Sequence, residues 1–203
     1  MVRMPLGEYR KKRRFTKTPE PKGSTAVRRK SAGNLFVVQK HRATALHYDF
    51  RLEANGVLVS WAVPKGPSLD PSQKRLAMAV EDHPLDYARF EGTIPQGEYG
   101  GGTVMVWDIG TYDLEDDEDF ATAYKKGRLT FTLHGKKLKG RWSLIRTGGT
   151  RQWLLFKRTD RYASKDVDIT VDKPRSVLTR RLLATIAREG GGDVEKAASG
   201  DPH

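Results

Sequence analysis

Short runs of hydrophobic residues, several of them alternating with polar ones, follow one another between positions 34 and 158. Glycine, proline and aspartate separate these runs, and short alternating runs between turn residues are typical of β-strands. We expect eight strands, at residues 35–39, 46–53, 57–63, 76–81, 103–108, 128–133, 140–145 and 153–157. The fold class is therefore all-β, and about eight strands suit a barrel or a sandwich.

The pattern changes outside these strands. Two long loops, 64–73 and 91–102, are rich in proline or glycine, and such loops in a compact domain are commonly functional. An acidic run at 113–119 leads into a short helix that ends near Gly127, and hydrophobic residues at helical spacing predict an amphipathic helix over 176–188. We divide the chain into a basic N-terminal segment (1–33), a β-domain (34–158), an extension with the amphipathic helix (159–189) and a disordered tail (190–203).

Composition narrows the class of protein. With 37% hydrophobic and 31% charged residues, the 203-residue chain has the make-up of one globular domain. It contains no cysteine, which excludes disulfides, thiolate nucleophiles and iron–sulfur clusters, so any metal must be held by histidine and carboxylate. Neither a long apolar run nor a signal-peptide pattern occurs, so we expect a soluble cytoplasmic protein, associated with the nucleoid and without contact to membranes.

The charge of the chain is strongly positive and uneven. The formal net charge of +12 favours a polyanionic partner such as nucleic acid, because lysine and arginine bound to phosphates release condensed counterions. Residues 1–30 hold eleven basic side chains against Glu8 and Glu20. The basic residues are Arg3, Arg10, Lys11, Lys12, Arg13, Arg14, Lys17, Lys22, Arg28, Arg29 and Lys30. Such a segment either contacts a polyanion or serves as a solubilising tail.

Residues 47–53 (HYDFRLE) alternate strictly between polar and apolar positions. On a strand, this pattern places His47, Asp49 and Arg51 on one face and three hydrophobic residues on the other. A histidine and an aspartate two positions apart have the spacing of a metal-binding pair, and His41 supplies a third ligand if the intervening turn folds it back. Two imidazoles and one carboxylate suit manganese, zinc or ferrous iron. The alternative is a strand face that simply meets water.

Basic and hydrogen-bonding side chains gather in a second region. Arg75 and His83 flank the apolar strand at 76–80, and Tyr87 follows closely. Arginine bonds two phosphate oxygens at once and histidine donates a proton, so the group favours phosphate recognition. Lys65, on the proline-rich loop, is a candidate contact to a nucleic-acid backbone. The alternatives are that His83 caps a turn, Tyr87 packs in a core and Lys65 is an ordinary surface residue.

Two further features fit structural roles. Residues 97–102 (GEYGGG) lack the strand-to-helix context of a nucleotide-binding loop and predict a hairpin or a barrel corner. The tryptophans all lie in predicted strands, where we expect them in the core rather than as platforms for nucleic-acid bases. They are Trp61, Trp107, Trp142 and Trp153.

Longer motifs connect these regions. They are residues 41–51 (HRATALHYDFR), 61–71 (WAVPKGPSLDP), 81–87 (EDHPLDY), 90–100 (FEGTIPQGEYG) and 103–107 (TVMVW). In this order they resemble the 3′-phosphoesterase domain of bacterial DNA ligase D and its free-standing relatives, and the resemblance runs from about residue 6 to residue 158. It implies a small β-barrel of about eight strands with a polar interior active site, to which the sequence pattern adds short helices and a C-terminal helix.

The resemblance also implies an activity. A 3′-terminal ribonucleoside is removed by a phosphodiesterase step, and the 3′-phosphate that remains is then hydrolysed to a 3′-hydroxyl for repair and end joining. The implied cofactor is Mn²⁺, with Zn²⁺, Co²⁺ or another divalent transition metal as alternatives. The implied partners are DNA or RNA/DNA primer-template 3′ ends, together with a DNA ligase and a polymerase of the end-joining pathway, and the protein is expected to be a monomer.

Roles for single residues follow from the same resemblance. The implied metal ligands are His41, His47 and Asp49. The residues implied to hold the substrate phosphate are Arg51, Arg75, His83, Arg13 and Lys65. The implied catalytic residues are His83, Arg51, Arg75 and Tyr87. His83 is the candidate general acid. The N-terminal segment of the family carries an Arg-Asp pair that joins the active site, whereas this chain has Arg13 followed by Arg14.

Two other functions fit parts of the sequence. His47 and Asp49, with the distant His134 and Arg141 on a β-barrel, imitate the facial triad of an iron- and oxoglutarate-dependent oxygenase. The net charge of +12 and the arginine at position 14 also suit a nucleic-acid-binding module without catalysis.

Overall fold

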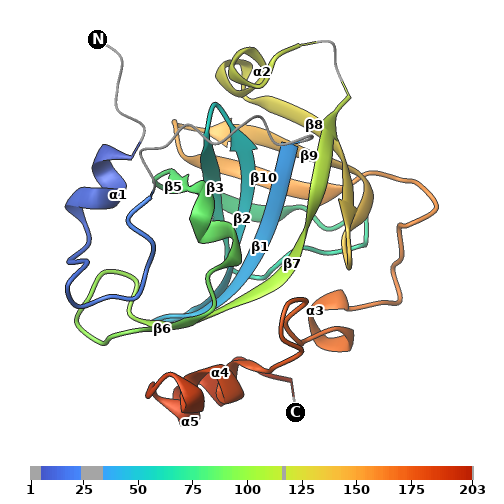
Figure 1. Cartoon of the computed structure of the whole chain (residues 1–203). Coiled ribbons are helices and arrows are strands. Elements are labelled where there is room, and N and C mark those ends of the chain that lie inside the picture. Colours follow the sequence, from blue (N-terminus) through green and yellow to red (C-terminus); the bar gives the residue numbers. More distant parts are fainter. Residues whose placement is uncertain (1–5, 24–33, 116–117, 203) are drawn as a thin grey trace.

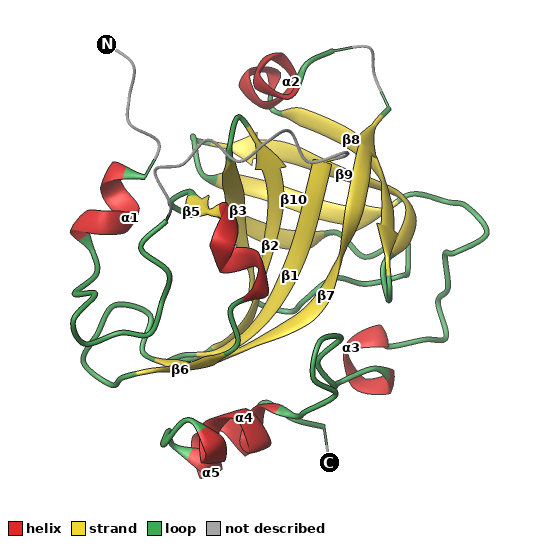
Figure 2. Cartoon of the chain, in the orientation of Figure 1, coloured by secondary structure: helices red, strands yellow, loops and turns green. Residues whose placement is uncertain are grey.

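The fold is a closed antiparallel β-barrel in the part of the chain that our computed structural model describes, residues 6–23, 34–115 and 118–202 (Figures 1 and 2). Among these residues, eight strands follow one another around the barrel in the order β1-β2-β3-β4-β10-β9-β8-β7, and β7 pairs again with β1. They are β1 (Asn34–Arg42), β2 (Leu46–Ala54), β3 (Val57–Val63), β4 (Arg75–Ala79), β7 (Gly102–Leu114), β8 (Arg128–Gly135), β9 (Lys139–Gly148) and β10 (Gln152–Lys157).

All eight predicted strands are present, and their closure makes the fold a barrel rather than a sandwich. Strand β1 runs three residues beyond its predicted end and thereby includes His41. Two short strands extend the sheet, because β5 (His83–Pro84) pairs with β3 and β6 (Gly92–Ile94) pairs with β7. The sequence pattern does not predict β5 or β6, since strands this short show no alternation.

Hydrophobic side chains from all eight barrel strands form one core cluster. All the tryptophans belong to it and are fully buried, as predicted from their positions in strands: Trp61, Trp107, Trp142 and Trp153. Because the strands close on one another and each contributes to this one cluster, its side chains fill the space that the strands enclose. The barrel interior is therefore apolar.

Strand β2 has one apolar and one polar face. Tyr48, Phe50 and Leu52 belong to the core cluster, so Asp49 and Arg51 point to the opposite face of the strand. The polar site therefore lies on the outside of the barrel wall, whereas the resemblance implies a polar interior. The alternation along β2 separates the two faces correctly but does not reveal which one faces the interior.

The outer face of β1, β2 and β3 is covered by two helices. Tyr9 of α1 (Gly7–Lys11) and Tyr87 of the 3-10 helix η1 (Leu85–Arg89) form a second buried cluster with Val37 of β1. Figure 1 shows η1 in front of β3 and β2, with α1 to its left. The polar side chains of the outer face are consequently buried, although they lie outside the barrel.

The helix expected near the acidic run is α2 (Phe120–Lys126). The Asp119 carboxylate accepts a hydrogen bond from the backbone N–H of Thr122 at its start. Gly127 ends the helix with a φ of +77°, a left-handed conformation that glycine adopts without strain. The predicted end near Gly127 is confirmed.

The C-terminal extension is built differently from the prediction. It contains α3 (Ile169–Asp172), α4 (Leu183–Glu189) and α5 (Val194–Ala198). The amphipathic helix predicted over 176–188 is wrong in its first half and begins only at Leu183. The reason is that the Ser176 hydroxyl accepts hydrogen bonds from the backbone N–H groups of Leu178 and Thr179, which hold a turn there.

The tail from Gly190, predicted to be disordered, instead contains α5 in its described part. Ala197 of α5 is buried in the core cluster. The Asp201 carboxylate accepts hydrogen bonds of 3.1 and 3.0 Å from the backbone N–H groups of Leu183 and Ala184 at the start of α4. These tertiary contacts order the segment, and composition does not disclose them. Among the described residues, no helix combines the length and apolar character needed to cross a membrane.

Candidate metal and phosphate site

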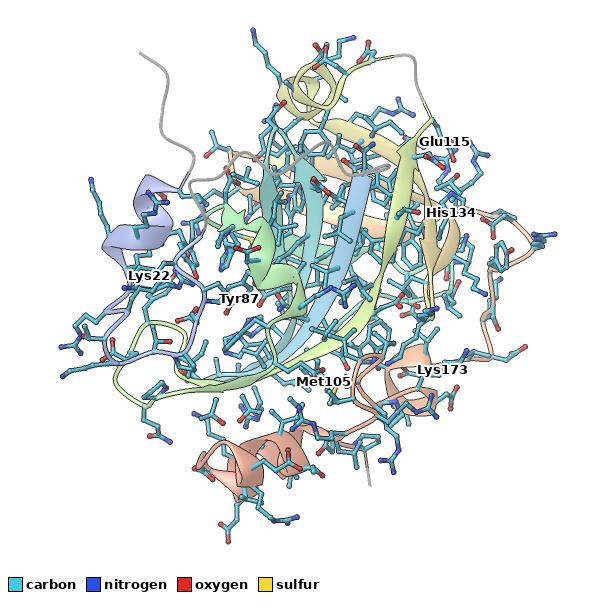
Figure 3. All side chains as sticks on the ribbon, in the orientation of Figure 1. Lys22, Tyr87, Met105, Glu115, His134 and Lys173 are labelled. Atoms are coloured by element: carbon cyan, nitrogen blue, oxygen red, sulfur yellow. The ribbon has the colours of Figure 1, made fainter. Side chains whose placement is uncertain are left out.

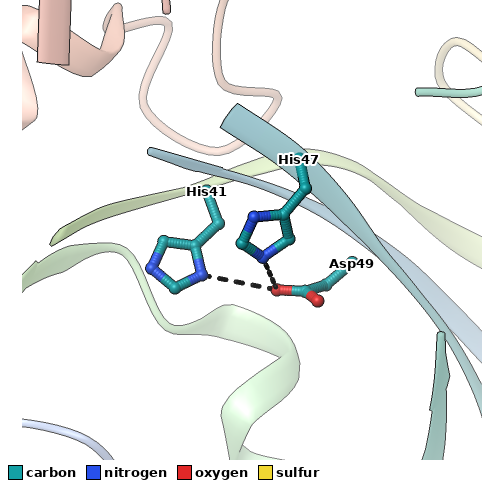
Figure 4. Close-up of side chains that lie close together, drawn as sticks. All are labelled: His41, His47 and Asp49. Carbon is teal, nitrogen blue, oxygen red and sulfur yellow. Dashed lines mark ion pairs between the residues drawn. The ribbon is translucent and has the colours of Figure 1, made fainter. Parts of the chain in front are cut away.

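His41, His47 and Asp49 converge at one end of β1 and β2 (Figure 4). The strand register sets His41 opposite His47, and Asp49 lies two residues further along the same face of β2. The Asp49 Oδ2 atom is 3.6 Å from His41 Nδ1 and 3.5 Å from His47 Nε2. One ligand atom from each residue lies within 4.8 Å of the others, so the three side chains can share one ion.

The hydrogen bonds of the two imidazoles prepare them as ligands. His41 Nε2 lies 2.8 Å from the carbonyl oxygen of Gly100, and His47 Nδ1 lies 3.1 Å from that of Ala45. A carbonyl only accepts, so these ring nitrogens carry the protons and the other nitrogen of each ring keeps its lone pair for a metal. Together with the Asp49 carboxylate, this donor set fits a divalent transition metal.

The charges around Asp49 favour its ionised form. Burial opposes ionisation, but Arg51, His41 and His47 outweigh it and hold the pKa of Asp49 well below its ordinary value. For His47, burial acts to lower the pKa, but the neighbouring Asp49 carboxylate acts to raise it and reverses this effect. The pKa of His47 is therefore raised above its ordinary value. Asp49 is therefore an anionic ligand at neutral pH.

Arg51 connects this trio to the neighbouring polar groups. Its buried guanidinium donates from Nε to Gln39 Oε1 and from Nη1 to the Ser60 hydroxyl, both at 2.8 Å. The Nη2 atom lies 3.3 Å from Asp49 Oδ2, and Nη1 lies 2.9 Å from His83 Nδ1. A phosphate bound by a metal at the trio would consequently meet Arg51.

His83 lies between two guanidinium groups. Arg51 approaches its Nδ1 atom, and Arg13 Nη2 lies 3.2 Å from its Nε2 atom. Burial, together with Arg51 and Arg13, lowers the pKa of His83 well below its ordinary value. The carbonyl oxygen of Glu81, 2.9 Å from Nδ1, accepts a hydrogen bond from the N–H of the neutral ring. His83 is therefore a neutral imidazole when no anion is bound nearby.

The N-terminal segment completes the cluster. Arg13 Nε donates to Glu20 Oε1 at 2.8 Å, and both side chains are almost fully buried. The Tyr87 hydroxyl donates to the same Glu20 oxygen at 3.0 Å, while the Tyr9 hydroxyl donates to the carbonyl oxygen of Pro21 at 2.6 Å. The basic segment up to residue 23 is thus built into the site rather than forming a solubilising tail. Residues 24–33 lie outside the described part.

Gln39, Ser60 and Glu20 were not among the site residues predicted from the sequence. Gln39 lies two positions before His41 on the same strand face, so the alternation of β1 carried a signal for it. Ser60 and Glu20 gave none, because a serine in a strand and a glutamate in a basic segment are unremarkable.

Arg14 does not occupy the place of a carboxylate in the cluster. Its guanidinium points to the glycine-rich loop and donates to both Glu98 oxygens, at 2.7 and 3.1 Å. The Arg14 side chain is 61% exposed, while that of Glu98 is 8% exposed. Position 14 therefore ties the N-terminal segment to the loop between β6 and β7.

Two predicted phosphate contacts, Arg75 and Lys65, are not brought into the cluster. Arg75 shares the face of β4 that carries Ala77 and Ala79 of the barrel core, and its charge acts on the Asp168 carboxyl. Lys65 is exposed on the connection between β3 and β4. Their phosphate-binding roles stay predictions.

The alternative trio with His134 does not form. His134 is exposed on β8, where its Nε2 atom lies 2.8 Å from Asp113 Oδ2, and Figure 3 shows it on the other side of the barrel from Tyr87. Among the described residues, the group of histidines and carboxylates close enough to hold an ion is the trio of β1 and β2. The third ligand candidate is His41, which argues against the oxygenase arrangement.

The fold and the site together define a β-barrel domain with a candidate metal centre beside a cluster of arginine and histidine side chains. Residues 39–146, more than half of the chain, match the family described as DNA Ligase D 3′-phosphoesterase domain. The chain belongs to this family.

Individual relatives agree with the family match. The chain is 56% identical over 185 residues to the multifunctional non-homologous end joining protein LigD of Pseudomonas aeruginosa, covering 88% of this chain and 22% of that protein. It is 52% identical over 152 residues to the multifunctional non-homologous end joining DNA repair protein LigD of Mycobacterium tuberculosis, covering 75% of this chain and 19% of that protein. The chain thus spans about a fifth of the length of these relatives.

Proposed function

We propose that this chain is a metal-dependent phosphoesterase that processes the 3′ ends of DNA strands. It would remove a 3′-terminal ribonucleoside and then hydrolyse the remaining 3′-phosphate to a 3′-hydroxyl. The observation that carries the proposal is the position of Arg51, whose guanidinium contacts both the candidate metal ligand Asp49 and His83. A phosphate there would be bound by a metal on one side and by cations on the other.

His41 Nδ1, His47 Nε2 and Asp49 would hold the metal, for which Mn²⁺ is our first candidate. When bound, such an ion polarises a phosphate oxygen and lowers the pKa of a coordinated water. Arg51 and Arg13 flank the expected phosphate position, where their charges offset the negative charge that builds up in the transition state.

His83 would act on the leaving oxygen. The neutral ring becomes easier to protonate when a phosphate adds negative charge beside it, because a nearby opposite charge favours the charged form. Protonated His83 then donates a proton to the alkoxide that departs in either step. Tyr87, whose hydroxyl is held by Glu20, would support the phosphate from η1.

The biological setting of the proposal is DNA repair in the cytoplasm, at the nucleoid. Relatives of the chain are named non-homologous end joining proteins, which supports a substrate of DNA or RNA/DNA primer-template ends and cooperation with a ligase and a polymerase. The product, a 3′-hydroxyl, is the end that sealing and extension both require.

The test uses two oligonucleotides, one ending in a 3′-phosphate and one ending in a single 3′-ribonucleoside. With Mn²⁺ we expect phosphate release from the first and nucleoside release from the second, and a chelator should stop both. His47→Ala should lose metal binding and both activities. His83→Ala should keep metal binding but slow both steps by about 100-fold or more, since general acid catalysis contributes about 10²–10⁴-fold.

Two outcomes contradict the proposal. Binding of the oligonucleotides without any metal-dependent release would indicate a nucleic-acid-binding module without catalysis. Full rates in His83→Ala, or loss of its metal, would contradict the role of His83.

A further inference from the structure

Tyr99 is an exposed aromatic residue at the rim of the candidate site. Its side chain lies on the loop between β6 and β7, and the residue is 47% exposed. The loop belongs to a glycine-rich motif, residues 97–102, to which the proposed reaction gives no role. A single exposed aromatic side chain is ordinary on a protein surface, and what distinguishes Tyr99 is its place at the rim of the candidate site.

Both halves of the candidate site contact this loop. On the metal side, the carbonyl oxygen of Gly100 accepts from His41 Nε2 at 2.8 Å. On the phosphate side, the Tyr99 hydroxyl lies 3.4 Å from Glu81 Oε2, and the backbone of Glu81 accepts from His83. The Arg13 guanidinium, which flanks the expected phosphate position, lies 5.5 Å from the Tyr99 ring centroid, so Tyr99 lies at the rim of that position.

The loop holds Tyr99 in place. Arg14 binds Glu98 with two hydrogen bonds, and the backbone N–H of Gly101 donates to the carbonyl oxygen of Glu98 at 3.0 Å. Lys12 Nζ lies 3.3 Å from the Tyr99 hydroxyl and 4.7 Å from the ring centroid. The ring is thus positioned before any substrate arrives, although much of it remains exposed.

We propose that Tyr99 is the binding platform for the base of the 3′-terminal nucleoside, the group that leaves in the first step. This inference rests on the proposed function. The bases on the other side of the phosphate stack on their neighbours in the strand, whereas the terminal base can turn onto a protein ring. Stacking uses the flat face that every base has, so Tyr99 would bind the terminal nucleoside without regard to sequence.

The proposal separates the two substrates. After the first step the terminal nucleoside is gone, so Tyr99 has no base to bind in the second. Tyr99→Ala should raise the KM for an oligonucleotide ending in a 3′-ribonucleoside by about 5- to 150-fold, the range of base–aromatic stacking. For the same oligonucleotide ending in a 3′-phosphate, the fold-change in KM caused by Tyr99→Ala should be at least about five times smaller. Tyr99→Phe, which keeps the ring and removes the hydroxyl, should restore most of the loss.

A substrate with an abasic 3′-terminal ribose provides the second measurement. In the wild type, losing the base should raise the KM as much as Tyr99→Ala does, and the variant should show no further loss on the abasic substrate. Tyr162→Ala is the matched control, because Tyr162 is a similarly exposed tyrosine on the connection between β10 and α3.

Several results would overturn the inference. They are equal KM changes for both substrates, no change for the ribonucleoside substrate, or an abasic substrate that still responds to Tyr99→Ala. Failure of the proposed function would look different, because the wild type itself would then release neither nucleoside nor phosphate in the presence of Mn²⁺.

Discussion

At the scale of single residues, the site depends on the hydrogen bonds of those polar atoms that do not face the expected metal or phosphate. Backbone carbonyls accept one hydrogen bond each from a ring N–H of His41 and of His47, which leaves the other ring nitrogens available to a metal. Gln39 and Ser60 fix the guanidinium of Arg51 in a buried position. Such supporting contacts determine whether a group is a ligand, a cation or a proton donor.

His83 gives a prediction about pH. Burial, Arg51 and Arg13 lower its folded pKa, while an unfolded histidine titrates at about 6.5. Below about pH 6.5 the unfolded chain therefore binds more protons at this residue, so the stability that neutral His83 contributes is complete above that pH and is lost as the pH falls. In metal-free protein, the free energy of unfolding of the wild type relative to His83→Gln should decrease from about pH 7 to about pH 5.

Urea denaturation of both proteins over that range provides the measurement, and a difference that stays constant or grows toward low pH would refute the prediction. The sequence suggested His83 as a site residue because Arg75 and Tyr87 lie near it in the chain. It could not reveal that the neighbouring cations would be Arg51 and Arg13, since these come from distant segments.

At the scale of elements, the N-terminal segment is joined to the barrel by ion pairs of two kinds. The Arg13–Glu20 pair is buried, with side chains 4% and 0% exposed. The Arg14–Glu98 pair joins an arginine that is 61% exposed to a glutamate that is 8% exposed. Breaking the Arg13–Glu20 pair leaves a buried charge uncompensated. Removing Arg14, which lies at the surface, instead opens the Glu98 carboxylate to water, so its charge is screened.

Arg13→Ala should therefore destabilise the protein by about 3–5 kcal/mol, and Arg14→Ala by no more than about 1 kcal/mol. Denaturation of the two variants under identical conditions makes the comparison. Equal losses would mean that the segment is not anchored through Glu20. Arg13→Ala combined with Glu20→Gln should recover part of the stability, because the buried charge is removed with its partner.

Strands were easier to predict than the rest of the elements. Turn residues mark both ends of the run that became β3, and it has the predicted bounds, 57–63. The helix α4 begins later than predicted because Ser176 holds a local turn, and the spacing of hydrophobic residues does not indicate such a turn. The short strand β5 owes its existence to pairing with β3, a contact between segments that no local pattern contains.

At the scale of the whole molecule, the barrel wall has two buried faces with different roles. The inner face carries the hydrophobic core, and the outer face of β1 and β2 carries the site under α1 and η1. The strict alternation of residues 47–53 places residues on both faces of β2. The sequence therefore separated the two faces but did not reveal which one lines the barrel interior. The +12 charge agrees with a nucleic-acid partner, and this partner stays a proposal.

The most direct measurement is a calorimetric titration of Mn²⁺ into the metal-free protein and four variants. The account predicts one ion per chain, and His41→Ala, His47→Ala and Asp49→Ala should each weaken binding by more than about 100-fold, because outer-shell changes alone cost about 10- to 100-fold. His134→Ala, which removes a histidine far from the trio, should bind like the wild type. Unchanged affinity in any of the three trio variants, or loss in His134→Ala, would contradict the site.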